Sequence, residues 1–370
     1  MTDAVVIGGG VVGSSVAMHL ADAGLSVIVV ERSGGPVEAS TRNGGGVRAQ
    51  CRNRPERLLA MRSQQLWRQL ELDNGVDFEY RVSGNARLAY SDAALDKLRA
   101  EQLEEHADGL HTEIWTREQL NAQMPFLSPD VLGAKVCPSD GHANPILATW
   151  AVIAAAKRCG ARYLTDTTAV AIGTVGGMVD SVVVHDSREG CTEIATPLVV
   201  HAAGAWSKDL ASHVGIDLPL VPSRNAMMIT ESLPPMFDAF LSSHEKQVYL
   251  RQAQKGHVHI GGVFDIPGTF DQSVGVDEME KLARAVELVP ALKQARILRT
   301  WAGTLDYTPD HLPLVGPVVG LGGYVVAAGF SGHGFCLGPV VGEAVADLVL
   351  DRPPHVDLSA LSPSRLEIAA

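Results

Sequence analysis

Three glycines near the start of the sequence have the spacing of a site that receives phosphate groups. Gly8, Gly10 and Gly13 form a G-x-G-x-x-G pattern, in which Val11 and Val12 fill the second gap. Gly8 permits a tight turn, Gly10 lets a pyrophosphate approach the backbone, and Gly13 lets a helix pack closely on a strand. The N-terminus of the helix that follows would then receive the negative charge. The pattern predicts a dinucleotide site, and a glycine turn that binds nothing is the alternative.

An acidic residue further along the chain completes this pattern. Glu31 follows the last glycine at close to the spacing of about 20 residues that such sites use. Its carboxylate can accept hydrogen bonds from both hydroxyls of an adenosine ribose, and it disfavours a phosphorylated ribose. Arg32, the next residue, is included in the predicted site.

A second glycine-rich segment near the other end of the chain follows an apolar run at residues 324–328. Gly329, Gly332 and Gly334 free the backbone to approach a ligand, with His333 and Phe335 beside them. A helix is expected to begin near residues 338–339 and to point its N-terminus at the same place. Two such segments at opposite ends of the chain suit a long ligand, and a loop that only turns a corner is the alternative.

A third segment, residues 40–48, places three glycines among polar donors. Such a loop can wrap a flat ring while its amides point inward. Arg42 and Arg48 could equally be ordinary surface charges. The loop residues assigned to the cofactor are Ser40, Thr41, Arg42, Asn43, Gly44 and Gly45.

The elements that must position these segments begin with a strand at residues 4–7, a helix at 11–23 and a strand at 26–31, an order typical of a parallel sheet. Asn144, Pro145 and Gly160 mark the ends of a helix over residues 145–159. After it, the strand-like segments 162–172, 179–185 and 193–200 are predicted to return to the sheet.

The remaining middle of the chain has an α+β pattern, with strands at residues 247–251 and 257–261 and one helix near 276–289. The predicted fold is an α/β dinucleotide-binding, Rossmann-like domain with a parallel sheet, plus an α+β substrate-binding domain with a mainly antiparallel sheet. The predicted boundaries give the first domain residues 1–80, 143–217 and 300–365. The second domain takes residues 81–142 and 218–299.

Composition narrows the function. The chain has 370 residues, of which 46% are hydrophobic and 19% charged, so it can bury a large core. A net charge of −12 without a basic stripe disfavours nucleic acid and anionic membranes as partners. No basic leader or long uninterrupted apolar run is present, and we expect a cytoplasmic protein without a transmembrane segment. The five cysteines are widely spaced, which suits a reducing compartment and offers no metal site.

Taken together, these segments resemble the D-amino acid oxidase superfamily, which holds glycine oxidase, sarcosine oxidase and related amino-acid and opine dehydrogenases. Within it the chain is most similar to the catalytic β subunits of heteromeric sarcosine, opine and hydroxyproline or proline dehydrogenases. The resemblance spans nearly the full length and is carried by residues 8–13 with Glu31, 40–48, 199–206, 300–303, 310–316 and 329–335.

The resemblance implies a non-covalent FAD whose adenosine lies on residues 8–13 and Glu31. Its isoalloxazine ring would lie between residues 42–46 and 332–335. Substrate would stack on the ring, pass a hydride from its α-carbon to flavin N5, and leave an imine that water hydrolyses. A separate α subunit or electron acceptor is implied as partner, and an FMN at the subunit interface is allowed. The further FAD contacts implied are Val170, Ala203, Gly204, Trp206 and Gly303.

The chain lacks the residues that members of this family use to attach FAD covalently and to bind the substrate carboxylate. The segment Arg299-Thr300-Trp301 lacks the cysteine to which monomeric sarcosine oxidases attach FAD, so covalent attachment is not expected. Cys336 stands where those enzymes place a lysine for the substrate carboxylate, and Leu305 lies near the position of a glycine oxidase arginine.

A substrate carboxylate would therefore need Arg48, Arg251 or Tyr249. Strand alternation puts the last two on one face. A buried structural tyrosine with a surface arginine is the alternative.

His259 aligns with the lysine that speeds the reaction of sarcosine oxidases with oxygen. A neutral imidazole stabilises superoxide less than a cation does, which favours a dehydrogenase that passes electrons to a partner. His333 either hydrogen-bonds the flavin or only shapes its loop. The alternatives are a self-sufficient oxidase that makes hydrogen peroxide and a flavin-binding subunit without activity.

Overall fold

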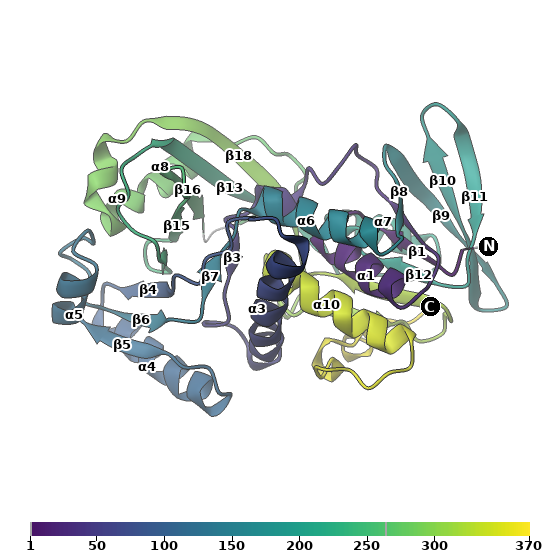
Figure 1. Ribbon diagram of the computed structural model, residues 1–370, viewed down its shortest axis with the longest axis horizontal. Coiled ribbons are helices and arrows are strands. Elements are labelled where there is room, and N and C mark those ends of the chain that lie inside the picture. The colour runs from purple at the N-terminus through teal and green to yellow at the C-terminus, as the bar shows by residue number, and fades with distance from the viewer. Residues whose placement is uncertain (1, 263–264) are drawn as a thin grey trace.

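The computed structural model describes residues 2–262 and 265–370 and contains two large sheets (Figure 1). The first is six-stranded, and all its strands run parallel except β19, which is antiparallel to β20. Its central strands are continuous Val, Ile and Ala runs, as expected for strands covered on both faces. Their order is β19 (Leu314–Pro317), β20 (Tyr324–Ala328), β12 (Val199–His201), β1 (Ala4–Ile7), β2 (Val27–Val30) and β8 (Arg162–Leu164).

Helices cover one face of this sheet. The core on that face joins strand residues such as Val6 and Val29 to α1 (Val11–Asp22), α6 (Pro145–Arg158) and α10 (Gly334–Val349). The predicted strand–helix–strand order at the start of the chain is confirmed. So is the helix that follows Asn144, whose side chain accepts hydrogen bonds from the amides of Ile146 and Leu147.

The opposite face of the sheet is covered by a three-stranded antiparallel sheet, β9 (Thr167–Val175), β10 (Met178–Asp186) and β11 (Gly190–Ala195). The prediction that segments 162–172, 179–185 and 193–200 all return to the first sheet is therefore only partly right. Asp166, with a φ of 54°, turns the chain between β8 and β9. Within residues 162–201, β8 at the start and β12 at the end pair with strands of the first sheet.

The second large sheet has nine strands and is mainly antiparallel. Strands predicted from residues 247–251 and 257–261 are confirmed within it, and the helix predicted at 276–289 is divided at Arg284. Its strands are β17 (Ile266–Pro267), β13 (Val221–Ser232), β16 (His257–Gly262), β15 (Val248–Gln252), β14 (Phe240–Ser243), β4 (Asn85–Ala89), β6 (Gly133–Cys137), β5 (Glu113–Thr116) and β18 (Ile297–Tyr307).

Helices line the outside of the second sheet, and two connecting elements lie between the sheets (Figure 1). The mixture of a parallel and a mainly antiparallel sheet confirms the predicted fold class, and the residue boundaries of the two domains remain a prediction. The outer helices are α4 (Asp92–Ala107), α5 (Arg117–Gln123), α8 (Val276–Ala283) and α9 (Ala285–Leu288). The connecting elements are α3 (Arg54–Asn74) and the pair β3 (Gly46–Val47) and β7 (Gly141–His142).

The last long helix differs from its prediction. It begins at Gly334 rather than near Gly338, and Pro339 lies inside it. A Cβ at Gly338 would lie 2.9 Å from Val11 Cγ2, and one at Gly342 would lie 2.5 Å from Ser15. These two glycines therefore serve the close packing of α10 on α1 and do not mark the start of a helix. None of the helices in the described residues is long and apolar enough to cross a membrane.

Candidate active site

The first glycine motif lets the turn after β1 and the start of α1 pack closely on neighbouring backbone. Gly8 has a φ of 109°, and a Cβ there would lie 2.3 Å from the carbonyl oxygen of Ala202. A Cβ at Gly13 would lie 2.0 Å from the carbonyl oxygen of Gly8. Helix α1 begins directly after Gly10, which provides no side-chain cap, and Ser40 Oγ accepts a hydrogen bond from its first amide, Val11 N. The helix dipole makes this end positive and favourable for an anion.

Glu31 lies at the carboxyl end of β2 and faces this motif. Its Oε2 accepts a hydrogen bond from Gly9 N at 2.8 Å, and its Oε1 accepts one from Ser33 N at 2.9 Å. Each carboxylate oxygen can accept a further hydrogen bond, so two ribose hydroxyls can still be bound.

A cavity of about 220 Å³ opens beside these residues. The predicted Gly8, Gly10, Glu31, Arg32, Ser40, Ala203, Gly204 and Trp206 line it. The Arg32 guanidinium lies 3.4 Å from the centre of the Trp206 ring. Val170 is not among the described residues that line the cavity: its side chain is exposed, and its carbonyl accepts a hydrogen bond from His213 Nδ1.

The loop of residues 40–48 is held by its own polar groups. Ser40 Oγ accepts a hydrogen bond from Val11 N at 3.0 Å, which ties the loop to the first turn of α1. Asn43 Oδ1 accepts one from Gly45 N at 2.7 Å, and Thr41 Oγ1 donates to Pro36 O at 2.9 Å. These hydrogen bonds define the conformation of the loop and its position against α1.

Arg42 connects this loop to β18. Its Nη1 donates to the carbonyl of Ala302 at 2.9 Å and to Gln272 Oε1 at 2.7 Å, while Trp301 Nε1 donates to the carbonyl of Arg42 at 3.0 Å. Arg42 is thus not an ordinary surface charge, although its guanidinium is occupied by protein acceptors.

The second glycine segment, residues 329–334, folds back over β18. Ser331 and Gly332 have φ values of 49° and 86°. Asp306 Oδ2 accepts a hydrogen bond from Gly329 N, and burial raises the pKa of this carboxyl to about 6. Phe335 lines a recess together with Gly332 and His333, and its ring stacks on Trp67 with centroids 5.1 Å apart.

His333 lies at the N-terminus of α10. Its Nδ1 is 2.8 Å from Glu56 Oε1. Burial lowers the pKa of His333, assisted by the charge of Arg52, against the effect of Glu56. Because the ionised Glu56 can only accept, Nδ1 carries a proton, and Nε2 of the neutral ring is an acceptor.

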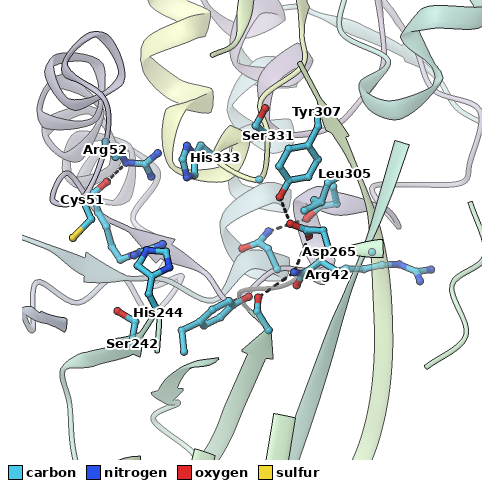
Figure 2. A pocket seen from close by; sticks show the side chains of 18 of the residues that line it. Arg42, Cys51, Arg52, Ser242, His244, Asp265, Leu305, Tyr307, Ser331 and His333 are labelled. Atoms are coloured by element: carbon cyan, nitrogen blue, oxygen red, sulfur yellow. Dashed lines mark hydrogen bonds between the residues drawn. The ribbon is translucent and has the colours of Figure 1, made fainter. Parts of the chain in front are cut away.

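The two glycine loops meet the second sheet at a cavity of about 340 Å³ (Figure 2). The structure brings together seven residues that were predicted from the sequence: Arg42, Asn43, Arg48, Tyr249, Gly303, Gly332 and His333. Leu305 lies in the same wall. Burial lowers the pKa of Arg48 to about 10, so this side chain is cationic at neutral pH.

Tyr249 reaches this cavity because two glycines make room for its ring. A Cβ at Gly44 would lie 2.3 Å from Tyr249 Cε2, and one at Gly261 would lie 2.0 Å from Tyr249 Cζ. The hydroxyl donates to Met227 Sδ at 3.0 Å, and burial raises the pKa of Tyr249 to about 12. The phenol is therefore neutral and can act as a hydrogen-bond donor.

Arg251 and His259 are not among the described residues that line this cavity. They are cross-strand neighbours on β15 and β16. Arg251 is buried, in contrast to the surface arginine considered above, and its Nε donates to the carbonyl of Gly44 at 2.6 Å. Burial lowers the pKa of His259 to about 2, so its ring is neutral.

Sequence reasoning missed several polar residues in the cavity. Tyr307 Oη donates to Asp265 Oδ2 at 2.6 Å, and Asn225 Nδ2 donates to Asp265 Oδ1 at 3.0 Å (Figure 2). Further missed residues are Gln50, Cys51, Arg52, Arg87, Ser242, His244 and Ser331. Arg52 lies four residues after Arg48, and a search for arginines near the glycine loop would have found it.

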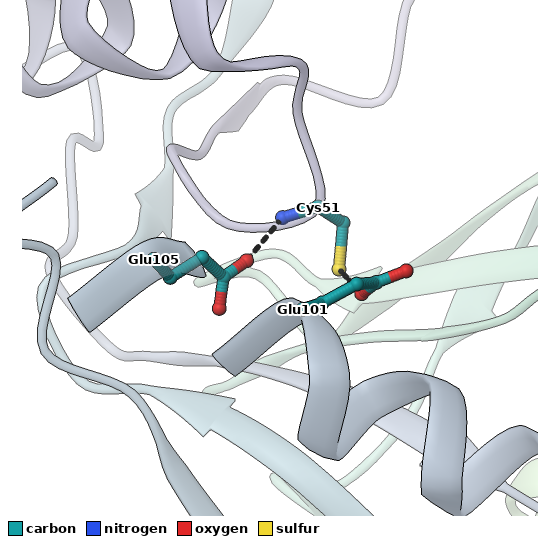
Figure 3. Close-up of side chains that lie close together, drawn as sticks. All are labelled: Cys51, Glu101 and Glu105. Carbon is teal, nitrogen blue, oxygen red and sulfur yellow. Dashed lines mark hydrogen bonds between the residues drawn. The ribbon is translucent and has the colours of Figure 1, made fainter. Parts of the chain in front are cut away.

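Cys51, at the edge of the cavity, lies near Glu101 and Glu105 in an arrangement that resembles a metal site (Figure 3). Lys135 Nζ, however, donates to Glu101 Oε2 and to Glu105 Oε1, both at 2.8 Å. Burial opposes the charge of Lys135, but Cys51 and both carboxylates raise its pKa overall. The ammonium group is thus shared by the two acids, and the cluster anchors the loop to α4 and β6.

Comparisons with known proteins agree with this geometry. The chain is 26% identical over 398 residues to the mitochondrial dimethylglycine dehydrogenase of Mus musculus, matching 98% of this chain but only 44% of that protein. It is 28% identical to one of the subunits of an opine oxidase from Rhizobium meliloti, with 84% of each chain covered. The structure of L-proline dehydrogenase from P. horikoshii superposes with a TM-score of 0.93 at 30% identity, covering 99% of this chain and 98% of that one.

The family model described as "DAO: FAD dependent oxidoreductase" matches residues 3–348. Its description names FAD, and the FMN that the resemblance allowed at a subunit interface is not supported. The glycine cradle, Glu31 and the two loops around the cavity fit that cofactor. The chain therefore belongs to the DAO family of FAD-dependent oxidoreductases.

Proposed function

We propose that this protein oxidises the carbon–nitrogen bond of an amino, imino or secondary-amine acid with a non-covalently bound FAD. The observation that carries this proposal is the cavity between the two glycine loops, in which cationic Arg48 lies beside Tyr249 and His333. A carboxylate binds well to such a guanidinium group. The names of the similar proteins, which refer to dimethylglycine, opines and L-proline, support the same substrate class.

The cofactor would lie along both cavities. Its adenosine would bind at residues 8–13 and Glu31, and its ring between residues 42–46 and 332–335. Val12 and Gly13 at the start of α1 would face the pyrophosphate. We propose non-covalent binding because the segment 299–301 contains no cysteine.

The oxidising chemistry, acceptance of a hydride at flavin N5, would come from the bound FAD. Arg48 would hold the substrate carboxylate and so orient the α-carbon. The neutral Tyr249 hydroxyl would donate a hydrogen bond to the substrate only by giving up the one it makes to Met227 Sδ, a weak acceptor. His333 Nε2 can accept a hydrogen bond from the amine as the nitrogen gives up its proton. The carbon loses a hydride and the nitrogen a proton, which leaves an imine for water to hydrolyse.

We infer that the electrons pass to a separate protein or acceptor and not directly to oxygen. The neutral, buried His259 offers no cation where a lysine is expected, and the likeness to a protein named as a subunit supports a heteromer. A self-sufficient oxidase is the second candidate, because Arg48 places a permanent cation in the cavity, and a cation can stabilise superoxide as oxygen is reduced.

Anaerobic addition of amino and N-alkyl amino acids to the purified, FAD-loaded protein tests the proposal. We expect a substrate of this class to bleach the visible flavin band, and a protein that binds FAD but is bleached by none of them would contradict it. Hydrogen peroxide formation by the isolated chain in air would favour the oxidase over the dehydrogenase.

A further inference from the structure

We propose that the substrate carries two carboxylate groups: either an amino acid with an acidic side chain or a secondary amine whose two substituents each bear a carboxylate. This inference rests on the proposed function, because it names the substrate class of the same cavity. It is carried by three arginines that face the cavity together, Arg48, Arg52 and Arg87.

The three guanidinium groups are short of partners among the described residues. Arg52 and Arg87 are each only 7% exposed. Within these three side chains, the buried nitrogens that have no hydrogen-bond partner among the described residues are Arg48 Nε, Arg52 Nη1, and Nε and Nη1 of Arg87. Arg52 Nε does donate to the carbonyl of Arg48 at 2.6 Å, so its guanidinium is only partly satisfied. Leaving buried donor groups unpaired costs free energy, so a ligand that supplies acceptors is favoured.

The acids nearest to these arginines are already engaged. Glu56 Oε1 lies 3.9 Å from Arg52 Nη1 but only 2.8 Å from His333 Nδ1. Asp140 accepts hydrogen bonds from Ala49 N at 2.7 Å and Gln64 Nε2 at 2.8 Å, and burial raises its pKa. In the part of the chain that the structure describes, no hydrogen bond joins either acid to the three arginines.

The arginines form two separate places for a carboxylate. Arg48 and Arg52 come from the loop after β3, and both also line the recess bounded by Gly332 and His333, next to the predicted flavin ring. In Figure 2, Arg52 lies beside His333. This pair suits the carboxylate attached to the reacting carbon.

Arg87 is not among the described residues of that recess and marks the second place. It stands on β4 directly across from Ser242 on β14, whose other neighbour is Tyr249 on β15. His244 lines the same cavity and lies beside Ser242 in Figure 2. Arg87 and the Ser242 hydroxyl, which has no partner among the described residues, can bind a second carboxylate at the outer end of the substrate.

A substrate with a single carboxylate would satisfy only one of these places. With glycine or sarcosine bound to Arg48 and Arg52, Arg87 would keep its unpaired donors. The enzyme would therefore discriminate against substrates with one carboxylate, because they leave the buried charge of Arg87 unpaired.

The test is a calorimetric titration of the FAD-loaded protein with glutarate and with butyrate, unreactive acids with two carboxylates and one. We expect glutarate to bind about 10-fold more tightly or better. In Arg87→Gln this ratio should fall to near one, and Arg87→Lys should restore part of it. Arg99→Gln is the matched control, because Arg99 is an exposed arginine on α4 paired with Asp96, and the ratio should be unchanged.

Equal binding of the two acids by the unmodified protein would overturn the inference, and so would a ratio that survives in Arg87→Gln with full FAD content. Bleaching by norvaline and sarcosine as efficiently as by glutamate and iminodiacetate would also overturn it, while leaving the proposed function intact. The protein could instead prefer glutarate while none of these amines bleaches the flavin. That result would support the dicarboxylate site and contradict the proposed function.

Discussion

The two ends of the elongated site are built from different materials. The nucleotide end consists of backbone amides, glycines and the start of a helix, with Glu31 as its main acid. The substrate end consists of side chains, among them Arg48, Arg87 and Tyr249, that come from strands and loops far apart in the sequence. Backbone cradles depend on the absence of side chains, whereas the substrate end depends on which side chains are present.

The largest effect should come from adding one methyl group to the nucleotide end. A Cβ at Gly13 would lie 2.0 Å from the backbone oxygen of Gly8, which cannot move aside as a flexible side chain can. We expect Gly13→Ala to cost more than about 3 kcal/mol and to abolish FAD retention. Thermal unfolding and FAD content after dialysis measure both effects. Gly34→Ala is the control, since its Cβ would lie 3.5 Å from Asp166 Oδ1, and a similar loss there would contradict this account.

The nucleotide end also contains a buried carboxyl group, that of Asp306, whose titration should affect the stability of the protein. Its pKa of about 6 exceeds the value of about 3.9 expected in the unfolded chain. Between these two values the folded protein holds a proton that the unfolded chain has lost. The free energy of unfolding of the FAD-free protein should therefore fall by up to about 3 kcal/mol as the pH rises from about 4 to above 6.

The comparison for this effect is Asp306→Asn, which cannot ionise. Its stability should lose this part of the pH dependence, as followed by denaturant unfolding at several pH values. Parallel pH profiles for the two proteins would show that Asp306 does not titrate in this range.

At the substrate end, a methyl group added at Gly261 should affect activity by displacing the ring of Tyr249. Gly261→Ala places a Cβ within 2.0 Å of Tyr249 Cζ, so the ring must leave its position. We expect a loss of about 2 kcal/mol in kcat/KM with FAD content preserved. Steady-state kinetics measure the loss of activity, and the flavin spectrum measures the FAD content. A loss of FAD as large as the loss of activity would contradict the separation between the nucleotide end and the substrate end.

Glu31→Gln should have the smallest effect. The amide keeps the shape of the side chain but has one acceptor oxygen in place of two, so we expect FAD to bind about 10-fold more weakly. Equilibrium dialysis against FAD measures this change. Unaltered affinity would show that Glu31 serves only the backbone amides of Gly9 and Ser33.

This contrast also explains what could be predicted from the sequence. The glycine cradle, Glu31 and the strands and helix around them are local, because the conformation they need is written in neighbouring residues. Arg87 and Asp265 could not be found in this way, since they reach the cavity only through the pairing of β4 with β14 and through the packing of the second sheet. Arg251 was assigned to the cavity because it shares a strand face with Tyr249, but a hydrogen bond to Gly44 holds it elsewhere.

A crystal structure of the protein purified with FAD tests the central claim most directly, which is that the two glycine loops and the arginine-lined cavity meet at one flavin ring. We predict electron density for the ring between residues 42–46 and 332–335, with one face open to Arg48 and Tyr249. A ring found outside these loops, or a ring screened from the cavity by protein, would contradict the account.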